Sequence, residues 1–252
     1  MSLVAATRNG PALVLSLGAA PAHPLSLAMI RDLHAALDHA AESAEVSLVV
    51  IEGAGHIFCA GHDLKEIARH REDADHGKAY LTELFTACGA MMQRLVGMPQ
   101  ATLARVEGIA TAGGLQLVAS CDLAYATPEA TFALPGVRNG GFCTTPAVAV
   151  SRAVGRRALM DLALTGRPRD ADWAERVGLV NAVYPSAEID TAVAELADIL
   201  SRGTPAAIAA GKAMTYAQLE MPLAQAYAEA TEVMIGHFMD PARIARDSDR
   251  WR

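Results

Sequence analysis

The chain has 252 residues, a formal net charge of −7 and a sequence isoelectric point near 5.6. An acidic balance without a tract rich in lysine and arginine argues against nucleic acid as the main partner. Although 52% of the residues are hydrophobic, many of these are alanines, and no apolar run reaches the ~18 residues that a membrane-spanning helix needs. We therefore expect neither a nucleic-acid nor a membrane partner.

The cysteines and the first residues bear on metal binding and location. Cys59, Cys88, Cys121 and Cys143 lie far apart, with no C-x-x-C motif and no cluster with histidine. This spacing predicts neither a zinc site nor a disulfide framework. Residues 1–10 lack the basic and apolar regions of a secretory signal. These features favour reduced thiols, no metal and a cytoplasmic location.

The first half of the chain alternates strand and helix patterns. Residues 12–17 predict a strand, and the apolar spacing from Leu25 predicts a helix with Ser26 as its N-cap. The β-branched run at 46–51 is typical of a buried strand. A second cycle consists of a helix over 78–96 and a strand over 101–106.

The patterns change towards the end of the chain. A small-residue helix is predicted over 108–120, and it is followed by strands at 123–126, 131–134 and 179–183. Beyond Pro185 only helical patterns occur, at 187–200, 205–219 and 223–239. The sequence therefore predicts an α/β protein with a core over residues 1–185 and a helical C-terminal region over residues 186–252.

The segment 53–66 could carry chemistry. Small residues follow a predicted strand here, and they would let a ligand approach free backbone amides closely. Asp63 stands where it could cap a following helix. The alternative is an ordinary turn between a strand and a helix.

The segment 107–122 is a second candidate. It has neither the Walker motif nor the dinucleotide-binding spacing. Gly113 and Gly114 at a helix start would place amides beside the positive end of the helix dipole, which suits a developing anion. The alternative is a small-residue helix packed against a neighbour.

Together the two segments resemble the enoyl-CoA hydratase/isomerase, or crotonase, superfamily. The resemblance rests on residues 58–64, on residues 108–114 and on Cys121 with Asp122, in that order, and it covers roughly residues 12–240. It implies a crotonase-like ββα superhelix core and a helical C-terminal region that builds homotrimers or homohexamers. The implied substrate is an acyl-CoA thioester, with coenzyme A as part of the substrate and no prosthetic group.

The resemblance also assigns residues to the site. In the family two backbone amides bind the thioester oxygen as it becomes an enolate, and by resemblance these belong to Ala60 and Gly113. The same comparison implies coenzyme A contacts at Pro21, Ala22, Ala60, Gly61, His62, Asp63, Leu64 and Gly113.

The acidic residues of a family hydratase are missing. The position of the first glutamate holds Gln116, and that of the second holds Gly136. A glutamine cannot act as a general base, although its amide can orient a water molecule or a carbonyl group. Each positioned acid or base contributes on the order of 10²- to 10⁴-fold, so hydration should be weak.

Two side chains are candidates to act instead. His62 could titrate near neutral pH as an acid or base, and the alternative is a ring turned towards coenzyme A or solvent. Cys143 lies on a glycine-flanked loop that should border the acyl pocket, but nothing in the sequence supplies the base that a thiol nucleophile needs. A packing role is favoured for Cys143.

These observations predict a hydratase- or isomerase-like enzyme of fatty acid metabolism that stabilises a thioester enolate, with weak hydratase activity. Two alternatives stay open. Decarboxylation of a malonyl-type CoA generates the enolate without a base. A non-catalytic acyl-CoA-binding oligomer would need no acid or base at all.

Overall fold

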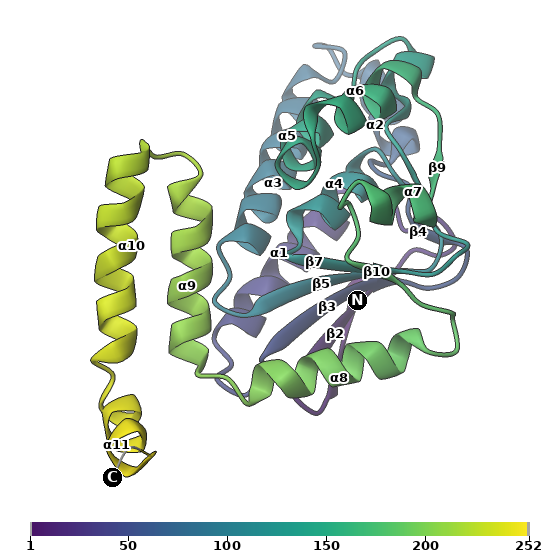
Figure 1. Ribbon diagram of the computed structural model, residues 1–252. Helices are drawn as coiled ribbons and strands as arrows, with labels where there is room; N and C mark the ends of the chain where they lie inside the picture. The colour runs from purple at the N-terminus through teal and green to yellow at the C-terminus, as the bar shows by residue number, and fades with distance from the viewer. Residues whose placement is uncertain (1, 251–252) are drawn as a thin grey trace.

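The computed structural model describes residues 2–250 as a twisted sheet flanked by helices, with a helical arm at the C-terminal end (Figure 1). The last two residues of the predicted C-terminal region, 251 and 252, lie outside this range. Among the described residues, no helix combines the length and apolar composition that a bilayer crossing requires.

The strands of the described residues form two sheets. The larger sheet has the order β1-β2-β3-β5-β7-β10, in which only the β1–β2 pair is antiparallel. Its strands are β1 (Val4–Asn9), β2 (Ala12–Leu17), β3 (Leu48–Gly53), β5 (Ala101–Val106), β7 (Leu123–Ala126) and β10 (Ala182–Val183). The smaller sheet contains β4 (Ile57–Cys59), β6 (Ile109–Thr111), β8 (Thr131–Ala133) and β9 (Arg169–Asp170), in that order.

The predicted ββα repeat is confirmed. The strand pairs β3–β4, β5–β6 and β7–β8 each give their first strand to the larger sheet and their second to the smaller one. Helices follow each pair: α2 (Leu64–Arg69) and α3 (Lys78–Val96), then α4 (Gly113–Ser120), then α5 (Thr144–Ala153). Short 3₁₀ helices, η1 (His70–Glu72) and η2 (Pro135–Asn139), lie within the first and third units. The smaller sheet thus brings the ends of successive units together.

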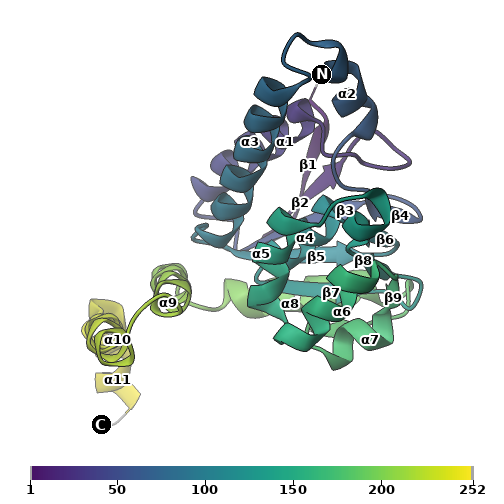
Figure 2. The same cartoon turned by 90° about the horizontal axis from the view of Figure 1, so that it is seen from above.

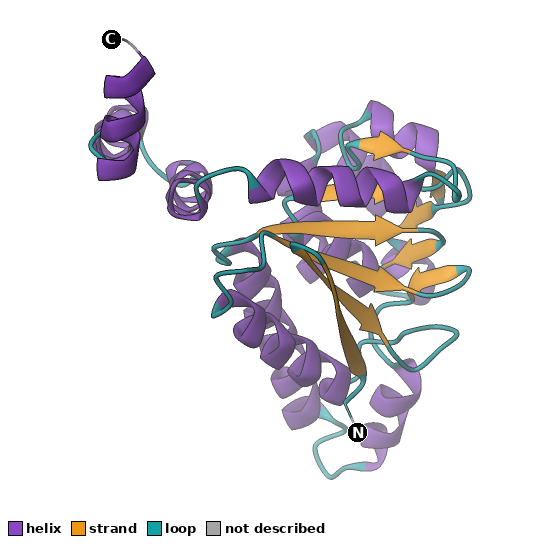
Figure 3. Cartoon of the chain, turned by 90° about the horizontal axis from the view of Figure 1, so that it is seen from below, coloured by secondary structure: helices purple, strands orange, loops and turns teal. Residues whose placement is uncertain are grey.

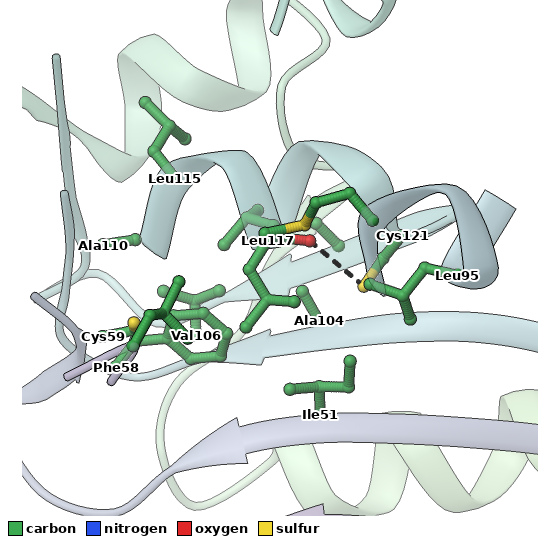
Figure 4. Packing of buried hydrophobic residues seen from close by; sticks show 14 of the residues in the cluster. Ile51, Phe58, Cys59, Leu95, Ala104, Val106, Ala110, Leu115, Leu117 and Cys121 are labelled. Atoms are coloured by element: carbon green, nitrogen blue, oxygen red, sulfur yellow. Dashed lines mark hydrogen bonds between the residues drawn. The ribbon is translucent and has the colours of Figure 1, made fainter. Parts of the chain in front are cut away.

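Helices cover both faces of the larger sheet. On one face α1 (Leu27–Ala41), α3 and α4 bury the main apolar core. Figure 4 shows Leu117 of α4 above Ala104 of β5, with Phe58 and Cys59 near the first turn of α4. The other face is covered by α8 (Ile189–Ser201), which lies across the strands in Figure 3.

The C-terminal helices extend away from the sheets. After α6 (Arg156–Thr165) and α7 (Ala171–Arg176), the chain passes through α8 to α9 (Pro205–Gln218), α10 (Leu223–Phe238) and α11 (Pro241–Arg250). Figure 2 shows α9 and α10 beside the main body, with α11 beyond them. Large apolar side chains are exposed on and around α10: Leu219, Leu223, Tyr227, Met234, Ile235, Phe238 and Met239.

One buried lysine attaches this arm to the core. The Lys212 ammonium of α9 lies 2.7 Å from the Asp122 carboxylate and donates to the Gln100 carbonyl oxygen at 2.9 Å. The Tyr216 hydroxyl donates to the same carboxylate at 2.7 Å. Because the Lys212 side chain is only 9% exposed, these contacts are largely shielded from water and fix α9 against the core.

The structure corrects the predicted elements in several places. Residues 109–111 form β6 rather than the start of a helix, and α4 begins at Gly113. Ala112, between them, has a φ of 51°, which is incompatible with a continuous right-handed helix. The strands β1 and β4 were not predicted, because β1 is mostly exposed and has no alternating pattern and β4 has three residues.

Candidate active site

The site is built where the loop after β4 meets the first turn of α4. A Cβ atom at Gly114 would lie 2.1 Å from the Cys59 carbonyl oxygen, and one at Gly61 would lie 2.9 Å from the Gly113 nitrogen. Gly61 also has a φ of +84°, a conformation that favours glycine. Only glycines at these positions let the two backbones approach so closely.

The structure corrects one half of the predicted amide pair. The Ala60 amide donates to the Ala22 carbonyl oxygen at 2.9 Å, so it is already engaged. Among the described residues, the amides of His62 and Gly113 have no hydrogen-bond acceptor. A Cβ atom at Gly113 would lie 3.3 Å from the His62 ring and 3.4 Å from the Gly61 Cα, so these two free amides are neighbours.

The residues predicted to bind coenzyme A come together in space. The turn before α1 pairs with the loop after β4, since the Leu25 amide donates to the Gly61 carbonyl oxygen at 2.8 Å, beside the contact between Ala60 and Ala22. The buried His23 ring holds this turn, with its nitrogens 2.8 Å and 2.9 Å from the Gly18 and Ala54 carbonyl oxygens. Pro21 and Ala22 therefore adjoin residues 60–64.

Asp63 has a structural role. Its side chain caps α2 and accepts hydrogen bonds from the amides of Lys65 at 2.9 Å and Glu66 at 3.1 Å. The predicted N-cap at Ser26 is confirmed in the same way, because its hydroxyl accepts from the Met29 amide. Leu64, the first residue of α2, is 70% exposed and open to a ligand.

The His62 ring lies between Gly113 and α3. Its centroid is 5.0 Å from that of Phe85, with the rings edge to face, and its Nε2 atom is buried without a partner among the described residues. Burial lowers the pKa of His62 to about 4. The imidazole is therefore uncharged at neutral pH, which contradicts the expectation that it titrates there.

Gln116 faces the same region of α4. It follows Gly113 by three residues and so lies on the same side of the helix. Its side chain is buried, with 5% exposure, and its Oε1 atom has no hydrogen-bond partner among the described residues. A buried carbonyl oxygen of this kind is available to a donor group of a ligand or a water molecule.

The position of the second family glutamate is closed. A Cβ atom at Gly136 would lie 2.6 Å from the Cys143 nitrogen and 2.8 Å from the Phe142 carbonyl carbon. The Gly136 amide donates to Cys143 Sγ at 3.2 Å, and burial raises the pKa of the Cys143 thiol. This site therefore holds no side chain, and the thiol is a packing and hydrogen-bonding group.

The described residues contain no group of three histidine, cysteine, aspartate or glutamate side chains placed to hold a metal ion. Among the described residues, the amides of His62 and Gly113 have no acceptor, and Gln116 Oε1 and His62 Nε2 are buried without a partner. Amide donors at the first turn of a helix favour a negatively charged ligand atom. The arrangement can therefore bind an oxyanion.

Comparisons with known proteins identify the family. The family model for enoyl-CoA hydratase/isomerase matches residues 18–248. The chain belongs to this family. Enoyl-CoA hydratase domain-containing protein 3 of mouse is 41% identical over 84% of this chain and 69% of its own length.

Two solved structures extend the family comparison. An enoyl-CoA hydratase/isomerase family protein from Silicibacter pomeroyi is 54% identical, with a TM-score of 0.89 over 94% of this chain and 100% of that one. Human enoyl-CoA hydratase domain-containing protein 3 is 32% identical, with a TM-score of 0.91 over 99% and 98% of the two chains. The crotonase-like fold class is thus confirmed.

The relatives overturn the predicted cytoplasmic location. The matched domain-containing protein 3 sequences of rat, mouse and human are all named as mitochondrial. The cytoplasmic prediction rested on the lack of a secretory pattern in residues 1–10, and this lack does not distinguish cytoplasm from mitochondrion.

We predict that Gly136→Ala destabilises the fold by about 1–3 kcal/mol, because the added methyl group meets the backbone of Phe142 and Cys143. Urea unfolding measures the change. Gly141→Ala is the matched control in the same loop, since its nearest atom would be 4.0 Å away. Equal stability of the two variants would contradict the closed position.

We predict that the His62 ring titrates near pH 4 rather than near 6.5, as measured by nuclear magnetic resonance. With the folded pKa below the unfolded one, the unfolded chain binds the extra proton between these values, so His62 reduces stability as the pH falls from 6.5 to 4. His62→Gln should therefore lose less stability than the wild type between pH 7 and 5. His56→Gln, at an exposed position, should behave as the wild type does.

Proposed function

We propose that this protein binds acyl-CoA thioesters and stabilises their enolates between the amides of His62 and Gly113. The observation that carries the proposal is that these neighbouring amides lack acceptors among the described residues, while the Ala60 amide is used internally. Two fixed donors aimed at a developing oxyanion are a large part of catalysis in such sites, and each contributes about 2.7–4 kcal/mol. Membership in the enoyl-CoA hydratase/isomerase family supports the substrate class.

We expect hydration of simple enoyl-CoA substrates to be weak. Gln116 cannot accept a proton from water as a glutamate does, and a side chain at position 136 would collide with the neighbouring loop. His62 does not replace them as a strong base, because its pKa of about 4 makes it only weakly basic.

Decarboxylation of a malonyl-type CoA is the second candidate. The bond between the α-carbon and the carboxylate carbon breaks, its electron pair forms the enolate, and carbon dioxide leaves; water then supplies the proton to the α-carbon. The uncharged Gln116 and His62 favour this reaction, because neither repels the substrate carboxylate as a family glutamate would.

Coenzyme A enters as part of the substrate, and the proposed chemistry uses no prosthetic group. We further propose that the protein assembles as a homotrimer or homohexamer through its C-terminal helices. The exposed apolar side chains of α10, including Leu223 at 75% and Tyr227 at 70%, support this proposal.

Gly113→Pro tests the amide pair. Proline removes the N–H yet fits the first position of a helix, whereas Gly113→Ala keeps the N–H and adds a Cβ atom at 3.1 Å from Leu25. We predict that Gly113→Pro loses the enolate absorbance of bound acetoacetyl-CoA and Gly113→Ala retains it. Retention in both variants contradicts the proposed oxyanion site. Efficient turnover of crotonyl-CoA by the wild type contradicts the weak-hydratase expectation.

Release of carbon dioxide from malonyl-, methylmalonyl- and ethylmalonyl-CoA tests the second candidate. We predict release by the wild type and a decrease of about 10²- to 10³-fold in Gly113→Pro, since the anionic transition state loses one donor. A flat result with every substrate removes decarboxylation. Tight calorimetric binding of CoA thioesters without any chemical change by mass spectrometry would instead identify a non-catalytic binder.

A further inference from the structure

A recess on α3 lies beside the proposed site and shares with it the contact between Phe85 and His62. A cleft of about 480 Å³ runs along the N-terminal half of α3 and the loop before it, and the residues used below are Arg71, Lys78, Leu81, Thr82 and Phe85. Figure 2 shows this loop joining α2 to α3 at one end of the molecule. Lys78, Leu81, Thr82 and Phe85 follow helical spacing, so one face of α3 forms the wall.

Phe85 connects the cleft to the oxyanion site. Its ring lines the cleft and contacts the His62 ring, with the two centroids 5.0 Å apart. The His62 backbone supplies one of the two proposed oxyanion donors. Phe85 thus lies beside a proposed oxyanion donor, and Leu81 lies one helical turn further along the cleft.

The far end of the cleft holds two cations, Arg71 and Lys78, and one carboxylate. Among the described residues, neither Arg71 nor Lys78 has a carboxylate partner, and Arg71 donates only to the His76 carbonyl oxygen, at 2.9 Å. Of the described residues, Asp75 is the one carboxylate that lines this cleft, and it accepts from the amides of Gly77 at 3.0 Å and Ala79 at 2.7 Å.

Two carboxylates near the cleft have partners of their own. Asp73 contacts His70 at 2.7 Å, and Glu83 pairs with Arg31. Neither of these carboxylates lines the cleft. The apolar wall thus ends at Arg71 and Lys78, which form no ion pair within residues 2–250 and together exceed the charge of the Asp75 carboxylate beside them.

The helix sets the length of a suitable ligand. Seven residues separate Phe85 from Lys78, which corresponds to about 10 Å along the helix axis. A flexible lysine side chain can cover part of this distance. An acyl chain that extends roughly 5 to 10 Å beyond Phe85 along this face would bring its end to the two cations, because Lys78 lies about 10 Å further along the helix and its side chain covers part of that distance.

We propose that this cleft extends the acyl site and binds the terminal carboxylate of a medium-chain dicarboxylyl-CoA. The inference rests on the proposed binding of acyl-CoA thioesters and adds the class of acyl group. Phe85 and Leu81 contact the methylene chain, and Arg71 and Lys78 bind the carboxylate at its end. The phosphates of coenzyme A are also anionic and could bind the same two cations. The experiment must therefore distinguish the terminal carboxylate from these phosphates.

Calorimetry can distinguish the two by measuring the affinity of the protein for suberyl-CoA, octanoyl-CoA and free CoA. The first two ligands have acyl chains of equal length and differ in the terminal carboxylate. We expect the wild type to bind suberyl-CoA about fivefold more tightly than octanoyl-CoA at low salt, as for a partly exposed ion pair. Lys78→Met and the double variant Arg71→Met/Lys78→Met should abolish this preference and leave the affinity for free CoA unchanged.

Lys78→Glu should reverse the preference, because it places a carboxylate at the end of the cleft. Arg156→Met/Arg157→Met is the matched control, since it removes two exposed arginines of α6 that do not line the cleft. It should keep the preference of the wild type. The substituted cleft residues are exposed, and thermal unfolding checks that each variant is folded.

The outcomes distinguish the inference from the proposed function. Equal affinity of the wild type for suberyl-CoA and octanoyl-CoA overturns the inference and leaves acyl-CoA binding intact. An equal loss of affinity for all three ligands in Lys78→Met assigns the cations to the phosphates of coenzyme A and also overturns it. Failure of the wild type to bind any of the three contradicts the proposed function itself, and the inference with it.

Discussion

The close backbone contact between residues 59–62 and the first turn of α4 is the constraint on which the rest of the site depends. Without a side chain, Gly114 lies directly against the Cys59 carbonyl group, where a Cβ atom would be 2.1 Å from the oxygen. Gly61 makes the corresponding approach to the Gly113 nitrogen. Each glycine adds chain entropy to the unfolded state and so costs about 0.5–1 kcal/mol relative to alanine in regular structure. The close approach makes neighbours of two amides, those of His62 and Gly113, that lie far apart in the sequence.

The electrostatic character of the site follows from what surrounds these amides. The start of α4 contributes the positive end of a helix dipole, which favours an anion. His62 is uncharged at neutral pH because burial lowers its pKa to about 4, Gln116 is uncharged, and position 136 has no room for a side chain. The site can therefore stabilise a negative charge but offers no strong base to create one by removing a proton. This combination favours reactions in which a group departs and the electron pair of the broken bond stays on the substrate, which creates the anion without a base.

The sequence predicted the parts of the molecule that local patterns determine. The helix over 78–96 and the three C-terminal helices have long apolar repeats, and Ser26 and Asp63 cap helices through their own side chains. Strands β4 and β6 have three residues each, too few for a periodic pattern. The sequence also predicted the Ala60 amide as a free donor, whereas the structure leaves the His62 amide free instead. This error has a different cause. The Ala60 amide is engaged because the turn before α1 brings the Ala22 carbonyl oxygen to it, and no local pattern contains that contact.

Lys212 of α9 connects the C-terminal arm to α3 and α4, the two helices beside the proposed site. The lysine contacts Asp122, which follows α4 after one intervening residue, and it also donates to the Leu95 carbonyl oxygen near the end of α3, at 3.3 Å. The opposite end of α4 supplies the Gly113 amide, and the opposite half of α3 lines the cleft beside His62. Removing Lys212 would leave the Asp122 carboxylate without its cation, although the Tyr216 hydroxyl would still donate to it. These contacts attach α9 to the far ends of α3 and α4, and α10 packs against α9.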